Sequence, residues 1–171
     1  SFKIAIVPFH MWTPDVYTGA PTPVTGFLSA AAKAASFAVF VRVLLTGIPL
    51  GGANWENIFW ILAVLSMTVG NLMALRQSEV KRMLAFSSIA HAGYVMVAVV
   101  VGSASAISGV IFYSFAYAVM GTGAFGILAI KDAGRAPKTY DDFAGYGRRN
   151  PFQALMMTLF MFSLIGLPLT G

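Results

Sequence analysis

No cysteine occurs among the 171 residues of the chain, and charged residues are scarce. Without cysteine, this chain has no disulfide, no thiolate metal site and no iron–sulfur cluster of its own. Only 10% of the residues are charged and 58% are hydrophobic, whereas roughly 25% are charged in an average soluble domain. Together with a mean hydropathy of +0.78, this composition predicts a membrane protein.

The charges that are present lie in short loops between apolar runs. Their net value of +5 is by itself compatible with nucleic-acid binding. The basic residues, however, gather in two loops, 76–82 and 131–150, as the positive-inside rule expects of a membrane protein. Two apolar runs separate these loops, so we expect both on the cytoplasmic side of a bacterial cytoplasmic membrane. The expected surroundings are therefore a lipid bilayer, and no nucleic acid.

Long apolar runs predict an all-α, polytopic transmembrane helix bundle that forms a single domain over residues 1–171. Each complete run has about the 20 residues that a helix needs to cross the hydrocarbon core, and the alternation typical of a β-barrel is missing. The sequence begins and ends within apolar patterns, so we expect it to be an internal part of a longer protein. The predicted spans are residues 24–46, 54–75, 83–101, 106–130 and, incompletely, 151–171.

Lys33 lies near the middle of the first complete span, roughly 14 Å from one end and 20 Å from the other at the rise of a helix. An ionisable group at that depth costs at least ~2.5–3.5 kcal/mol, so it calls for a functional or structural reason. The residues from Ser29 to Ser36 around it are small, which leaves room for water and for close helix packing. Two interpretations stay open: a lysine that exchanges protons in a transport path, or a structural lysine paired with a carboxylate.

Proline interrupts the helical pattern at two places. Pro8 follows Lys3 by five residues and removes the helical partner of the Ile4 carbonyl. His10 comes next, and histidine is the side chain best suited to proton exchange near neutral pH. Lys3 and His10 are therefore candidates for a proton relay, the alternative being two polar residues at a wet helix end. Residues 166–168 repeat the break, and paired broken helices are typical of transporters with inverted repeats.

His91 lies near the centre of the third complete span, where an ionisable residue again suggests a functional site. Ser87, His91 and Tyr94 fall at positions i, i+4 and i+7, so they share one helix face and are candidates for lining a hydrated path. The alternative is that His91 only packs between helices and forms a hydrogen bond there.

Nothing in the sequence predicts a cofactor or metal site in this chain. Residues 121–126 match the dinucleotide-binding pattern G-x-G-x-x-G, but they lie inside a predicted span and no strand precedes them. Neither histidine has a partner at metal-ligand spacing. Tyr113 and Tyr117 are interpreted as packing residues.

Three runs of this sequence resemble a known membrane family over nearly the whole chain: FKIAIVPFHMWTPDVYTGAPTPV (2–24), NLMALRQSEVKRMLAFSSIAHAGY (71–94) and SLIGLPLTG (163–171). They are similar to the antiporter-like membrane subunits of proton-pumping NADH:quinone oxidoreductases. The form of residues 12–24 looks most like subunit N, which is called subunit 2 in mitochondria, since the sister subunits L and M typically have W-L-P-D-A there.

The resemblance implies a fourteen-helix parent with an inverted-repeat antiporter-like fold, of which this chain runs from the end of helix 7 to the first half of helix 12. It also implies a non-redox translocase subunit, with NADH, FMN, iron–sulfur clusters and quinone in partner subunits of the complex. The family's helix 5 glutamate and helix 12 lysine would lie outside residues 1–171, the latter in a Gly-Lys pair within about ten residues of Gly171. The residues that match its proton relay are Lys3, His10, Lys33 and His91.

Two other functions remain as alternatives. The first is a subunit of the related multi-subunit cation/proton antiporters, which have similar core lysines but no redox partner. The second is a membrane scaffold whose buried lysines only hold helices together, in which case replacement of Lys33 by Met would leave function nearly intact.

Overall fold

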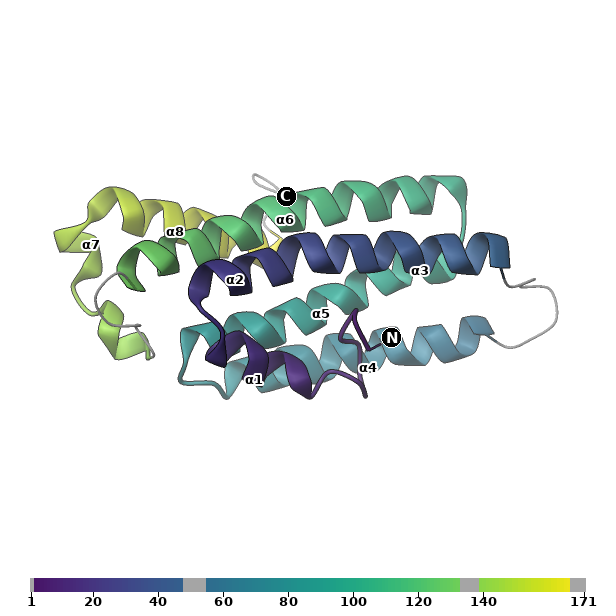
Figure 1. The fold of residues 1–171 in the computed structure, drawn as a ribbon, viewed down its shortest axis with the longest axis horizontal. Helices are drawn as coiled ribbons and strands as arrows, with labels where there is room; N and C mark the ends of the chain where they lie inside the picture. The colour runs from purple at the N-terminus through teal and green to yellow at the C-terminus, as the bar shows by residue number, and fades with distance from the viewer. Residues whose placement is uncertain (1, 48–54, 133–138, 167–171) are drawn as a thin grey trace.

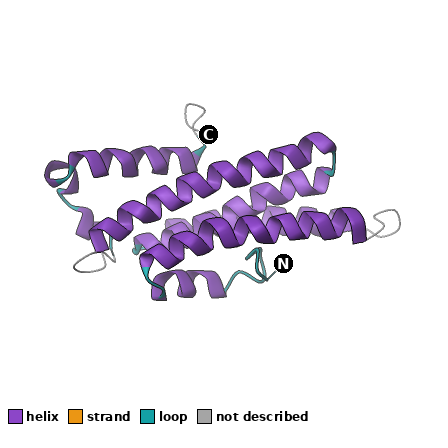
Figure 2. Cartoon of the chain, turned by 45° about the horizontal axis from the view of Figure 1, so that its top comes forward, coloured by secondary structure: helices purple, strands orange, loops and turns teal. Residues whose placement is uncertain are grey.

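The computed structural model describes residues 2–47, 55–132 and 139–166, and this part of the chain is helical without a β-strand, which confirms the all-α prediction. Long helices lie side by side and alternate in direction (Figures 1 and 2). The elements are α1 (Trp12–Gly19), α2 (Thr22–Phe27), the π-helical turn η1 (Leu28–Ala32), α3 (Lys33–Gly47), α4 (Trp55–Leu75), α5 (Val80–Val101), α6 (Ala104–Asp132), the 3₁₀ turn η2 (Tyr140–Phe143), α7 (Tyr146–Arg149) and α8 (Pro151–Ile165).

Four of these helical segments are long and apolar enough to cross a membrane. Among them α5 is the most buried, because α1, α4 and α6 all pack against it. Its core face is rich in small residues, which allow neighbouring backbones to approach closely. The four segments are Thr22–Leu44, which unites α2, η1 and α3, then Trp55–Leu75, Val80–Val101 and Ala104–Lys131.

Glycines set the contact between α4 and α5, the most extensive in the bundle. A Cβ atom added to Gly70 would lie 2.7 Å from the backbone nitrogen of Ala90. One added to Gly93 would lie 2.7 Å from Cγ of Met67 and 2.9 Å from the Ala63 carbonyl oxygen. The two helices therefore approach too closely for any side chain at either position.

The N-terminal part of the chain differs from the sequence-based prediction. Residues 2–11 form successive turns in place of the end of a helix, and α1 follows from Trp12 to Gly19. Proline is compatible with α1 because Pro14 stands in the first turn, where a missing N–H leaves no helical bond unmade. Asp15 in the same turn places a negative charge near the positive, N-terminal end of the helix dipole. Tyr17 lies on the side of α1 that is buried in the bundle.

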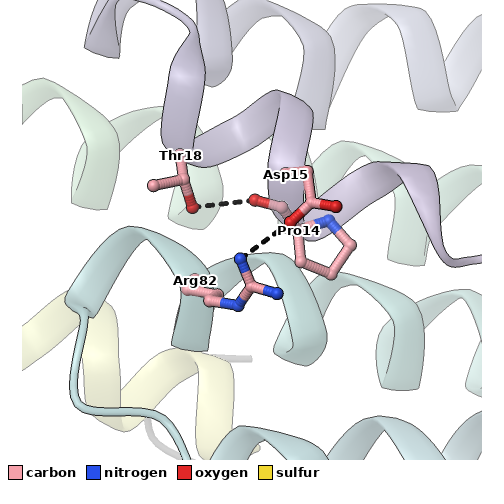
Figure 3. Close-up of polar contacts among 4 residues, drawn as sticks. All are labelled: Pro14, Asp15, Thr18 and Arg82. Atoms are coloured by element: carbon pink, nitrogen blue, oxygen red, sulfur yellow. Dashed lines mark hydrogen bonds and ion pairs between the residues drawn. The ribbon is translucent and has the colours of Figure 1, made fainter.

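Two basic residues near the start of α5 contact α1 and the residue that follows it. Arg82 donates to the Asp15 carboxylate at 2.8 Å (Figure 3), and Lys81 donates to the Ala20 carbonyl oxygen at 3.3 Å. The Asp15 side chain is 72% exposed, and an ion pair this accessible to solvent contributes under about 1 kcal/mol. Its main effect is to orient α1 above α5.

The turn before α5 and residues 139–150 lie at the same end of the bundle. An isolated β-bridge joins Glu79, in the turn before α5, to Thr139, just before η2. The turn between α5 and α6 lies at the opposite end (Figure 1). At the second predicted break, α8 ends at Gly166, whose φ of +85° is the left-handed conformation of a helix cap; Leu167 and Pro168 lie outside the described residues.

Replacing Gly93 or Gly70 by Ala is expected to destabilise the helix pair by about 1–3 kcal/mol, because the new methyl group overlaps the backbone of the facing helix. Gly109→Ala is the matched control, since nothing lies within 4 Å of a Cβ atom there. Unfolding of the purified protein in detergent measures the difference. Equal stability of the Gly93 and Gly109 variants would contradict the close approach of α4 and α5.

Candidate functional site

Lys33 begins α3, directly after the π-helical turn η1. A π-helical turn holds one residue more than an α-helical turn, so it rotates the residues after it relative to those before. Lys33 is buried, with 6% of its surface exposed. Its amine donates to the carbonyl oxygen of Ser88 on α5 at 2.6 Å and also to the Ser88 hydroxyl.

The surroundings of the Lys33 amine are polar but carry no negative charge within the described residues. Both of its hydrogen-bond partners are neutral oxygens of Ser88, and no carboxylate lies within ion-pair distance in this part of the chain. A buried lysine that only holds helices together is normally paired with a carboxylate. Dipoles alone stabilise the charge less, which suits a lysine that gains and loses a proton.

His91, three residues after Ser88 on α5, is also buried. Its Nδ1 forms a hydrogen bond of 2.6 Å with the hydroxyl of Tyr113 on α6. The imidazole ring contacts the rings of three tyrosines, with centroids 4.9 Å away for Tyr117, 5.6 Å for Tyr94 and 5.9 Å for Tyr113. These contacts hold the ring in one orientation at the interface of α5 and α6.

Three spaces follow one another through the bundle and meet at Lys33 and His91. The first, the lysine groove, has a volume of about 660 Å³ and is lined by both Lys3 and Lys33. The second, the central cavity, is lined by both Lys33 and His91, and its volume of about 10 Å³ is near the lower limit for one water molecule. The third, the histidine groove, has a volume of about 740 Å³ and extends from His91 to Gly166. Lys33 and His91 thus each border two of the three spaces.

The candidate residues are not all placed alike. Lys33 and His91 share the central cavity, and the exposed Lys3 faces Lys33 across the lysine groove. His10 is buried, but it is not among the residues that line these three spaces. Its Nδ1 and the nearby Thr13 Oγ1 are buried without a hydrogen-bond partner among the described residues. Thr13 does line the lysine groove.

The structure adds two residues that the sequence patterns did not single out. Ser88 binds the Lys33 amine, and Tyr113, which was interpreted as a packing residue, binds His91. Tyr113 and Tyr117 lie four residues apart on α6 and both face the central cavity, so their helical spacing was the available signal. Ser87 and Tyr94 line the histidine groove together with His91, as their spacing predicts.

A bundle of apolar spanning helices with lysine and histidine side chains along internal cavities is the architecture of a polytopic membrane transport protein. Comparison with known proteins identifies the particular family. The chain belongs to the NADH:quinone oxidoreductase/Mrp antiporter transmembrane family, which it matches over residues 1–171.

Individual relatives agree with this assignment. The chain is 55% identical over 171 residues to the NADH-quinone oxidoreductase subunit N of Trichlorobacter lovleyi, covering 99% of this chain and 35% of the relative. In a structure of respiratory complex I from Thermus thermophilus with bound aureothin, a chain of 40% identity superposes with a TM-score of 0.81, covering 98% of this chain and 36% of that one. The chain therefore spans about a third of the length of the relatives it matches.

A more distant structure shares the fold alone. A chain of the Mrp complex from Dietzia sp. DQ12-45-1b superposes with a TM-score of 0.87 at 20% identity, covering 98% of this chain and 31% of that chain.

Replacing Tyr113 by Phe should release the His91 ring, because Nδ1 loses its described hydrogen-bond partner. We expect a change in the ¹⁵N chemical shifts of the His91 ring nitrogens, and a loss of stability of about 0.5–1.5 kcal/mol. Solid-state NMR on ¹⁵N-histidine-labelled protein measures the shifts, and His10 serves as an internal reference. Tyr146→Phe is the control, since this buried tyrosine also loses a hydrogen bond, to Gln153, but does not line either space that His91 borders. Unchanged His91 shifts in Tyr113→Phe would contradict the hydrogen bond.

Proposed function

We propose that this chain is a proton-conducting part of the membrane arm of an NADH:quinone oxidoreductase, and that it acts as a translocase without redox chemistry of its own. The observation that carries the proposal is the series of spaces that connects Lys3, Lys33 and His91. Ionisable residues inside a membrane protein generally mark an ion or proton pathway. The similarity to subunits N of NADH-quinone oxidoreductases supports the same function.

In this proposal, Lys33 is the central exchange point. It takes up a proton from one side of the bundle and releases it to the other, because it borders both the lysine groove and the central cavity. Lys3 lines the same groove as Lys33, so it is proposed as the next member of the relay on that side.

His91 and His10 have different positions in the proposed relay. His91 follows Lys33, and the single water that the central cavity has room for would connect the two side chains. His10 is proposed as a member because of the family pattern and because its buried Nδ1 has no partner among the described residues. A buried polar atom of this kind usually binds water.

The assembly that surrounds the chain is part of the proposal. Other membrane subunits of the oxidoreductase complex would contact its apolar outer faces, and lipid would cover the remainder. NADH, FMN, the iron–sulfur clusters and quinone would belong to partner subunits. We propose a bacterial cytoplasmic membrane, with loops 76–82 and 131–150 on the cytoplasmic side, since both loops are basic.

A subunit of a multi-subunit cation/proton antiporter is the second candidate, because the Mrp complex shares the fold. Its identity of 20% is well below the 55% to a subunit N. The two functions differ in their driving force: proton movement depends on NADH oxidation in the first and on a cation gradient in the second.

Lys33→Ala in the full-length subunit should lower NADH-driven proton pumping by roughly tenfold or more, because the relay loses its central exchange group. Inverted membrane vesicles measure pumping and NADH:quinone turnover together, and both should fall. Arg76→Ala is the control, since it removes a positive charge from an exposed turn. Normal pumping in both Lys33→Ala and Lys33→Met would contradict the proposal and favour a scaffold.

The orientation is testable because residues 1–171 contain no cysteine. Single cysteines at the exposed positions Ser78 and Arg148 should react with a membrane-impermeant maleimide from the cytoplasmic side, and one at the exposed Ser105 only from the opposite side. The start of α5 and α7 lie at one end of the bundle, and the start of α6 lies at the other (Figure 1). Labelling of inverted and right-side-out vesicles, with any other cysteines of the subunit removed, makes the comparison. Reaction of Ser78→Cys and Arg148→Cys from opposite sides would contradict the topology.

A further inference from the structure

Ser88 lies where four elements of the bundle meet, and its side chain is completely buried. It belongs to α5 and binds the amine of Lys33 from α3. Two phenols line the spaces that Lys33 borders, that of Tyr17 from α1 in the lysine groove and that of Tyr117 from α6 in the central cavity. Side chains of four elements thus lie around the contact between Lys33 and Ser88.

A hydroxyl group is suited to this place because it both donates and accepts hydrogen bonds. When Lys33 is charged, its ammonium donates to the hydroxyl and carbonyl oxygens of Ser88, as in the structure. When Lys33 is neutral, the Ser88 hydroxyl can rotate and donate to the amine nitrogen, while an amine N–H still donates to the carbonyl. A carboxylate in the same place would bind the charged form much more strongly than the neutral form.

We propose that Ser88 is a positioning residue for Lys33, which holds the amine at the junction of the lysine groove and the central cavity in both of its protonation states. This inference rests on the proposed proton-conducting function. Without the hydroxyl, the Lys33 side chain has a single fixed anchor, the Ser88 carbonyl, and its flexible chain swings into the larger lysine groove. Proton exchange between Lys33 and His91 across the central cavity then slows.

The test compares Ser88→Ala with Ser88→Thr in the full-length subunit within its assembled complex, by NADH-driven proton pumping in inverted vesicles. We expect Ser88→Ala to lower pumping about tenfold, as for loss of a hydrogen bond to a charged group, and Ser88→Thr to restore most of it. A structural role predicts the opposite order, since Ala is smaller than Ser and Thr overfills a fully buried site. The matched control is Ser29→Ala, which removes an equally buried hydroxyl that binds the Gly26 carbonyl.

If Ser88→Ala and Ser88→Thr both pump slowly, the pH dependence of pumping distinguishes a positioning role from a structural one. A profile of Ser88→Ala that differs in shape from the wild type supports positioning of a titrating lysine, whereas profiles that superimpose after scaling overturn it. If Ser88→Ala fails to assemble, Ser88→Cys replaces it, because a thiol fills the site but bonds weakly, and the same fall is expected. The titratable groups that face Lys33 from the surrounding elements, all unchanged in these variants, are Lys3, Tyr17, His91, Tyr113 and Tyr117.

Pumping by Ser88→Ala at the wild-type rate would overturn the inference. The Lys33→Ala variant separates this failure from a failure of the proposed function. If Lys33→Ala abolishes pumping while Ser88→Ala does not, only the role of Ser88 is wrong. If both variants pump normally, the proposed function itself is wrong.

Discussion

The contact between the Lys33 amine and Ser88 brings together the parts of the bundle on which function depends. A lysine in the middle of a membrane-spanning segment is costly, and here two neutral oxygens of α5 compensate part of that cost. The contact joins α3 to the central helix of the bundle and places the amine between two internal spaces. No carboxylate within the described residues lies within ion-pair distance of the amine, so the contact is compatible with the proton exchange proposed for Lys33.

The packing around this contact follows from small residues. Gly70 and Gly93 allow α4 to lie against α5 without intervening side chains, so α5 stays central and its polar residues Ser88 and His91 stay away from lipid. On the other side, Tyr113 and Tyr117 of α6 close the central cavity around His91. The room left in the central cavity is near the lower limit for one water molecule, which is what the proposed proton transfer between Lys33 and His91 requires.

The sequence predicted the all-helical membrane class, since runs of apolar residues of spanning length have few other structures open to them. It also indicated Lys33 and His91, because an ionisable residue far from either membrane surface is conspicuous without any structure. The prediction was wrong for residues 2–11, where turns replace the expected helix end. Proline does not prevent α1, because Pro14 lies in the first turn of the helix and Tyr17 packs on its buried side.

The contacts of Ser88 with Lys33 and of Tyr113 with His91 could not be predicted from the sequence, for a geometric reason. The Lys33–Ser88 and His91–Tyr113 pairs are separated by 55 and 22 residues, so each contact depends on how two helices rotate about their axes. The π-helical turn η1, just before Lys33, changes that rotation. No pattern in the sequence marked the turn, whereas the spacing of Ser87, His91 and Tyr94 along one helix needed no such knowledge.

The central claim is that the three spaces form one hydrated path through Lys33 and His91. A structure of the complete membrane complex, at a resolution that reveals water, tests it most directly. The account predicts an ordered water in the central cavity within hydrogen-bonding distance of both side chains, and further waters from Lys33 toward Lys3 and from His91 toward Gly166. A dry central cavity, with apolar side chains between Lys33 and His91, would contradict it.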